Sequence, residues 1–171
     1  MIFSKTSFDK NAIEPLRIGD TPIDCVDQIK YLGTTIISKP SLCFSHEDDL
    51  RSFYRASNSV LNQVGSANEP IQMKLLYSHC VPCFSYASAA KEYSSRQMND
   101  CTVALNDAIR KIFTFHRWES VRTLREELGY PALTDIYAQA RKRFEKSLPG
   151  HLNSTVSRLF HQQQQQQQQL E

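Results

Sequence analysis

The chain has 171 residues, of which 40 % are hydrophobic and 22 % charged. This composition excludes a disordered or fibrous protein, and the length suits about one domain of roughly 100–200 residues. With only five glycines, the chain offers little for a turn-rich β barrel or a phosphate-cradling loop. A formal net charge of +2 neither establishes nor excludes a nucleic-acid partner.

The number and spacing of the cysteines argue against a disulfide framework. They are odd in number and stand at Cys25, Cys43, Cys80, Cys83 and Cys101. No signal peptide is recognisable, and no apolar stretch approaches the roughly 20 residues that span a bilayer. We therefore expect an intracellular protein, cytoplasmic or nuclear, with reduced thiols and no membrane partner.

Residues 1–40 are predicted to form a small antiparallel set of strands. Apolar and polar residues alternate on both sides of the turn signal Gly19-Asp20. A third run, residues 29–37, is rich in β-branched and aromatic side chains, and Lys39-Pro40-Ser41 ends it. Because an isolated hairpin is marginal in water, we expect the edges of these strands to need covering.

The segment 41–148 is predicted to form a helical bundle. Expected helix starts are Ser45, with Asp48 completing a capping box, then Asn68, Ser94 and Ser120. Gly65 is the expected C-cap of the first helix, and a last long helix is expected over residues 134–148. The helix after Ser94 carries an apolar face made of Met98, Cys101, Leu105, Ala108, Ile109, Ile112 and Phe113.

The predicted fold is therefore mostly α, with N-terminal strands followed by helices, and α+β overall. A proline at position 82 is expected to kink or end the second helix, because it lacks the backbone N–H. A short helix is expected within 149–161. The tail, residues 162–171, contains eight consecutive glutamines and is expected to be disordered or to extend that helix.

Several short motifs follow one another in a characteristic order. The segment from Leu16 to Val26 precedes Ile29-Lys30-Tyr31-Leu32-Gly33, and residues 76–86 read LYSHCVPCFSY. Residues 105–113 read LNDAIRKIF, residues 116–122 read HRWESVR, and residues 128–131 read LGYP. This set resembles the end of the palm, the primer-grip hairpin and the helical thumb of a non-LTR (LINE-type) retrotransposon reverse transcriptase. Ala87 stands where that family often has glycine.

The resemblance implies a thumb-like helical module that makes weak, sequence-independent contact with an RNA/DNA template–primer. It also implies that the catalytic aspartates belong to palm motifs upstream of Met1, so that the palm is missing from this chain. Polymerisation needs divalent metals held by carboxylates, and no paired-aspartate motif occurs here. We therefore expect no enzyme activity, cofactor or metal site in the isolated chain. Two alternatives remain. The first is an interaction or structural remnant with no nucleic-acid role, and the second is a thiol redox or zinc protein.

Two groups of residues are candidates for nucleic-acid binding. Tyr31, Leu32 and Gly33 could hold a primer backbone, with the glycine allowing close approach, or the glycine could simply mark a strand bend. The second group is cationic and comprises Arg110, Lys111, Arg117 and Arg122. Residues 105–146 contain nine bases and six acids, so a solvated helix surface explains these cations equally well.

Two further features have competing interpretations. Trp118 could stack on a base, but a lone tryptophan between helices is more often a core anchor. Cys80-Val81-Pro82-Cys83 could be redox-active if a helix N-terminus stabilised a thiolate, or could bind zinc together with His79. No second ligand pair accompanies this motif, so structural cysteines are the expected interpretation.

Overall fold

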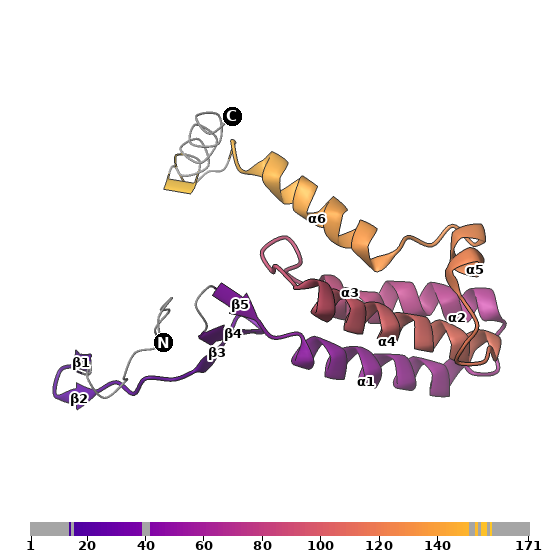
Figure 1. Ribbon diagram of the computed structural model, residues 1–171, viewed down its shortest axis with the longest axis horizontal. Helices are drawn as coiled ribbons and strands as arrows, with labels where there is room; N and C mark the ends of the chain where they lie inside the picture. Colours follow the sequence, from indigo (N-terminus) through magenta and orange to yellow (C-terminus); the bar gives the residue numbers. More distant parts are fainter. Residues whose placement is uncertain are drawn as a thin grey trace.

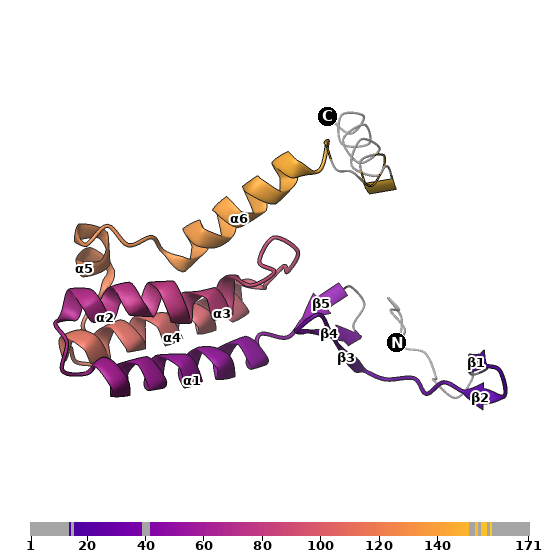
Figure 2. The ribbon, with the colours of Figure 1, turned by 180° about the vertical axis from the view of Figure 1, so that it is seen from behind.

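Short N-terminal strands followed by a helical bundle make up the fold (Figure 1 and, from behind, Figure 2). The computed structural model describes Glu14, residues 16–38 and 42–150, and Asn153, Thr155, Val156 and Arg158. The mostly α fold predicted from the sequence, with strands first, is confirmed. The residues 1–13, Lys39-Pro40-Ser41, most of the helix expected within 149–161, and the glutamine tail lie outside the described residues.

The strands form two separate antiparallel sheets. In the first, β1 (Arg17–Ile18) pairs with β2 (Thr21–Pro22) across a turn in which Gly19 has a φ of +60°. In the second, the order is β3 (Gln28–Tyr31), β4 (Thr34–Ser38) and β5 (Leu42–Phe44). All residues of β1, β2 and β3 are exposed, so the described part of the chain does not supply the cover that we expected for these strands.

The run 29–37, for which no internal turn was predicted, is a hairpin. Leu32 and Gly33 form its two-residue loop, with φ values of +46° and +74°. Positive φ at both loop positions is the geometry of a type I′ turn, which matches the twist of the flanking strands. Gly33 also lies against Tyr86: a Cβ at this position would come within 3.4 Å of the Tyr86 ring, and the Tyr86 hydroxyl donates to the Leu32 carbonyl at 3.0 Å.

Leu32→Asn should stabilise the protein by about 1 kcal/mol, because leucine is disfavoured in the left-handed region and asparagine tolerates it. The Leu32 side chain is 72 % exposed, so its replacement removes little packing. Urea unfolding measures the change. Leu32→Ala is the matched control, because alanine shortens the side chain without relieving the backbone, and it should give no gain. A loss of stability in the asparagine variant would contradict the turn assignment.

The helices are α1 (Glu47–Val64), α2 (Glu69–Leu75), a π-helical turn η2 (Leu76–Cys80), α3 (Val81–Ser85), α4 (Ser95–Phe113), α5 (Arg122–Glu127) and α6 (Leu133–Ser147). Among the described residues, no helix combines the length and apolarity needed to cross a membrane.

Two of the four predicted N-caps are confirmed. The Asn68 side chain accepts from the Ile71 N–H, and Ser94 forms the expected capping box with Gln97. The other two predictions were wrong. The N-cap of α1 is His46, because the Asp48 carboxylate accepts a hydrogen bond from Thr35 at 2.9 Å, and α5 is capped by Val121 rather than by Ser120. Gly65 is the C-cap of α1, as expected.

The proline at position 82 does not end its helix. The π-helical turn precedes it, in which the Val81 N–H bonds to the Leu76 carbonyl five residues back. Pro82 then occupies the first turn of α3, where its missing N–H leaves no intrahelical bond unmade. The predicted irregularity is therefore present, but as a π-helical turn inside a continuing helical segment.

The core lies between α1, the α2 to α3 segment, α4 and α6. Phe53 of α1 stacks on Phe84 of α3, with ring centroids 4.4 Å apart, and Ile109 of α4 is fully buried. The predicted apolar face of α4 is confirmed: its members are buried, apart from Met98 and Phe113, which are partly buried against the core. The helical spacing of apolar residues therefore predicts correctly which face of α4 packs into the core.

A buried ion pair joins the start of α1 to the loop between α3 and α4. The Lys91 ammonium lies 2.9 Å from the Asp49 carboxylate, and the two side chains are only 1 % and 10 % exposed. The Tyr93 hydroxyl donates to the same carboxylate. Gln97 donates to the Phe44 carbonyl at 2.8 Å and so connects α4 to β5.

Candidate nucleic-acid interface

The loop after α4 has a defined conformation. Thr114 adopts a left-handed conformation (φ +56°) that ends α4, and the Phe115 N–H bonds to the Arg110 carbonyl at 2.9 Å. The His116 N–H donates to the Glu119 carboxylate, and the Glu119 N–H donates back to the His116 carbonyl. The loop, residues 114–120, is therefore held against the end of α4 by its own hydrogen bonds.

This loop displays aromatic side chains to solvent. Trp118 is 81 % exposed, and its ring stacks on that of His116 with centroids 4.6 Å apart and planes 6° apart. The interpretation of Trp118 as a core anchor was therefore wrong. Trp118 lies in the short hydrogen-bonded turn between His116 and Glu119, which leaves its side chain in solvent. An exposed, flat aromatic pair is the kind of surface on which a nucleobase can stack.

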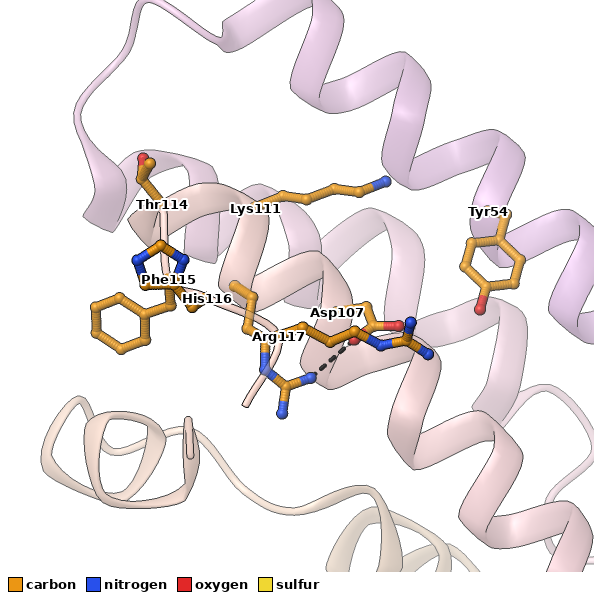
Figure 3. A pocket seen from close by; sticks show the side chains of 8 residues that line it. Tyr54, Asp107, Lys111, Thr114, Phe115, His116 and Arg117 are labelled. Carbon is orange, nitrogen blue, oxygen red and sulfur yellow. Dashed lines mark hydrogen bonds and ion pairs between the residues drawn. The ribbon is translucent and has the colours of Figure 1, made fainter. Parts of the chain in front are cut away.

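An open groove of about 560 Å³ lies between the loop, the end of α4 and α1 (Figure 3). Tyr54 of α1 stands on one side of this cationic groove, and Thr114, Phe115 and His116 stand on the other. The remaining lining residues are Asp107, Arg110, Lys111 and Arg117. Three cationic side chains and one carboxylate thus line the groove, so its net charge is positive.

The cations of the groove are not equivalent. The Arg110 side chain is 19 % exposed, pairs with Asp107 at 2.7 Å and donates through Nε to the Glu119 carbonyl. Arg110 therefore holds the loop in place. Lys111 is exposed, and its nearest polar partner is the Asn58 amide oxygen at 3.5 Å. Arg117 is exposed and makes no ion pair with any described residue. Lys111 and Arg117 are the cations available to an external anion.

Tyr54 adds a hydroxyl to the groove. Burial, followed by the Asp107 carboxylate, raises the pKa of this phenol above its ordinary value. The hydroxyl therefore stays protonated at neutral pH and can donate a hydrogen bond. Tyr54 is 41 % exposed, and its ring offers a second flat apolar face beside the cations.

The other predicted cations lie outside the cationic groove. Arg122 begins α5 and pairs with Glu126 at 2.9 Å. Arg125 is only 8 % exposed, so it does not belong to a solvated helix surface. On α6, Arg141 is paired with Glu92 and Glu145. Four of the nine bases in residues 105–146, namely Arg110, Arg122, Arg125 and Arg141, are thus paired or buried within the protein.

The Tyr31-Leu32-Gly33 turn and the cationic groove do not form one surface. The turn contacts Tyr86, and the same sheet is bound to the first turn of α4 through Gln97. The groove lies at the other end of α4, whose 19 residues extend over about 28 Å at 1.5 Å per residue. The structure therefore brings Arg110, Lys111 and Arg117 together and leaves Tyr31, Leu32, Gly33 and Arg122 elsewhere.

The cysteine motif lies in the core. Cys80 is fully buried, and burial raises the pKa of its thiol to about 11; burial also raises the pKa of Cys83. A reactive thiolate at neutral pH is therefore disfavoured. In the part of the chain that the structure describes, no three His, Cys, Asp or Glu side chains gather as a metal site would require. The cysteines act as small apolar side chains.

Sequence reasoning missed five of the residues that line the groove, namely Tyr54, Asp107, Thr114, Phe115 and His116. The alternation of aromatic and basic residues in Phe115-His116-Arg117-Trp118 was a usable signal, because such interleaving is typical of surfaces that bind single strands. No local signal pointed to Tyr54, which the fold brings to the groove from α1.

Comparison of the chain with protein-family models, with curated proteins and with solved structures gave no match.

Proposed function

We propose that the chain is a non-catalytic, thumb-like module that contacts RNA or DNA through the cationic groove. The observation that carries the proposal is the exposure of Trp118, stacked on His116, in the same loop as the unpaired Arg117. Surfaces that bind single-stranded nucleic acid usually combine aromatic side chains, on which bases stack, with cations that contact phosphates. The order of motifs, which resembles that of a non-LTR reverse transcriptase, also supports a role in nucleic-acid binding.

The chemistry of the groove sets the expected character of binding. Lys111 and Arg117 can each neutralise a phosphate, and such contacts carry no direct sequence information. With two available cations, the affinity should be low, about 10⁻⁴–10⁻⁶ M, as is typical of non-specific binding. In this proposal any catalytic carboxylates belong to a different polypeptide segment, and the chain supplies positioning alone.

The combined variant Lys111→Ala and Arg117→Ala should weaken nucleic-acid binding and flatten its dependence on salt. Each phosphate contact that is lost lowers the slope of log affinity against log salt by about 1, so the expected reduction is about 2. A salt titration against an RNA/DNA template–primer with a single-stranded overhang measures this slope. The fold should survive, because both side chains are exposed.

The matched control removes two charges from another surface. Lys142 and Arg143 are exposed residues of α6 outside the cationic groove. If the groove is the binding surface, Lys142→Ala with Arg143→Ala should leave the slope nearly unchanged. Equal slopes in the two double variants would mean that overall charge, and no particular groove, attracts the nucleic acid. No wild-type binding at low salt would overturn the proposed function.

The second candidate is an interaction protein with no nucleic-acid role, and the exposed strands favour it. Leu16, Ile18 and Leu32 are each more than 70 % exposed, and the β1–β2 hairpin lies apart from the helices in both views (Figures 1 and 2). A two-stranded hairpin of this kind gains stability when another chain covers it. Loss of a protein complex after Ile18→Lys, with unchanged nucleic-acid binding, would support this candidate.

A further inference from the structure

The aromatic side chains of the cationic groove lie on both of its sides. Tyr54 of α1 lines one side, and His116 lines the other. The ring of His116 covers one face of the Trp118 indole, and an exposure of 81 % leaves the other face open to solvent. The side chains of Lys111 and Arg117 lie between the two sides (Figure 3). Two flat surfaces thus flank the two cations that are available to an external anion.

The cations by themselves favour a duplex, but only weakly. The slope of log affinity against log salt is about 0.9 per phosphate contact for a duplex and about 0.7 for a single strand. For the two contacts that Lys111 and Arg117 can make, the slopes differ by about 0.4. The duplex therefore gains a factor of only about 2.5 in affinity for each tenfold fall in salt.

The aromatic rings favour an unpaired strand, and their effect is larger. Inside a duplex, each base is covered on both faces by its neighbours, so a protein ring cannot reach a base face unless the base leaves the stack. The bases of a single strand can stack on the protein, and each such stack strengthens binding at least about fivefold. Two stacked bases would give at least about 25-fold, which exceeds the advantage of the duplex.

We propose that the cationic groove selects an unpaired strand over a duplex by stacking two bases, one on Trp118 and one on Tyr54. The phosphates between these bases then meet Lys111 and Arg117, which lie between the two rings. The ligand is a single strand of at least two nucleotides. This inference rests on the proposed function, because it names the form of nucleic acid that the same groove takes.

A competition experiment tests this selectivity. A labelled single-stranded oligonucleotide without self-complementary sequence is bound to the protein, and its fluorescence anisotropy is followed. The competitors, compared at equal phosphate concentration, are the unlabelled strand, the same strand with abasic sites throughout, and a relaxed circular duplex, which has no terminal base pair. The unlabelled strand should compete at least about fivefold better than either of the others.

The possible failures of this experiment are distinguishable. If the duplex or the abasic strand competes as well as the intact strand, the selectivity is wrong, but the groove still binds phosphates and the proposed function stands. If the labelled strand does not bind at low salt, the proposed function is wrong, and the selectivity fails with it.

Matched substitutions separate the rings from the charges. Trp118→Ala should lower affinity for the strand at least about fivefold and leave affinity for the duplex unchanged, whereas Trp118→Phe keeps a flat ring and should retain most of the selectivity. The fold should survive, because Trp118 is exposed. Lys111→Ala with Arg117→Ala should instead weaken binding of both forms. An equal loss for strand and duplex in Trp118→Ala would overturn the proposal.

The same comparison on α1 tests the second stacked base. Tyr54→Leu removes the ring and should reduce the preference for the strand at least about fivefold, whereas Tyr54→Phe removes only the hydroxyl and should keep it. Thermal melting checks that both variants are folded. A folded Tyr54→Leu variant with the selectivity of the wild type would overturn the assignment of a base to Tyr54.

Discussion

Lys91→Met should lower the free energy of unfolding by about 3–5 kcal/mol, the usual effect of removing one partner of a buried ion pair. The Lys91 side chain is 1 % exposed and lies 2.9 Å from the Asp49 carboxylate. Methionine keeps the apolar stem and removes the ammonium, so the carboxylate is left buried with the Tyr93 hydroxyl as its remaining donor. The free energy of unfolding of most domains is only about 5–15 kcal/mol, so this loss is a large share of the total stability.

Two comparisons identify the cause of that loss. Adding Asp49→Asn to Lys91→Met should recover most of it, because the neutral amide no longer carries an uncompensated charge. Removing the cation of the exposed Arg122–Glu126 pair, with Arg122→Ala, should change stability little. Chemical denaturation of the four proteins gives the values. A Lys91→Met variant as stable as the wild type would show that the buried pair is absent in solution.

Ile109→Asp should unfold or aggregate the protein. Ile109 is fully buried on the apolar face of α4, in the core between α1, the α2 to α3 segment and α6. Aspartate there loses the hydrophobic contacts and buries a charge without a partner, a combination that exceeds the usual range of single substitutions. Far-UV circular dichroism with thermal melting follows the loss of helix.

Val103→Asp is the control on the same helix. Val103 is also β-branched, but its side chain is 45 % exposed on the outer face of α4. This change alters helix propensity and charge without burying the carboxylate, so it should cost well under 1 kcal/mol. Similar melting of Ile109→Asp and the wild type would contradict the assignment of α4 to the core.

The features that the sequence predicted best depend on residues close together in the chain. The caps at Asn68 and Ser94 use partners three residues away, and the apolar face of α4 repeats with the helical period. The Ser45 cap failed for a tertiary reason. Thr35 donates to Asp48, the residue that should have closed the capping box, and lowers its pKa.

Features that depend on residues far apart could not be predicted. The Lys91–Asp49 pair joins residues 42 positions apart, and Tyr86 reaches a carbonyl in a distant turn. The hairpin turn at Leu32-Gly33 lacks the usual asparagine or aspartate before its glycine, so no turn was predicted within residues 29–37.

The candidate site was predicted in part. The basic residues near the end of α4 and in the following loop pointed to the right segment, and three of them line the cationic groove. The sequence could not separate exposed cations from those used inside the protein, because Arg110 and Arg125 differ from Lys111 and Arg117 only in their tertiary surroundings.

Fluorescence of Trp118 tests the nucleic-acid proposal most directly. Trp118 is the single tryptophan of the chain and is 81 % exposed, so its emission reports the loop alone. Saturable quenching is expected when a single-stranded oligonucleotide is added at low salt, because a base stacks on the indole ring. The midpoint should move to higher concentration as salt rises, and oligonucleotides of different sequence should behave alike. Emission that stays constant up to millimolar oligonucleotide would contradict the proposed function.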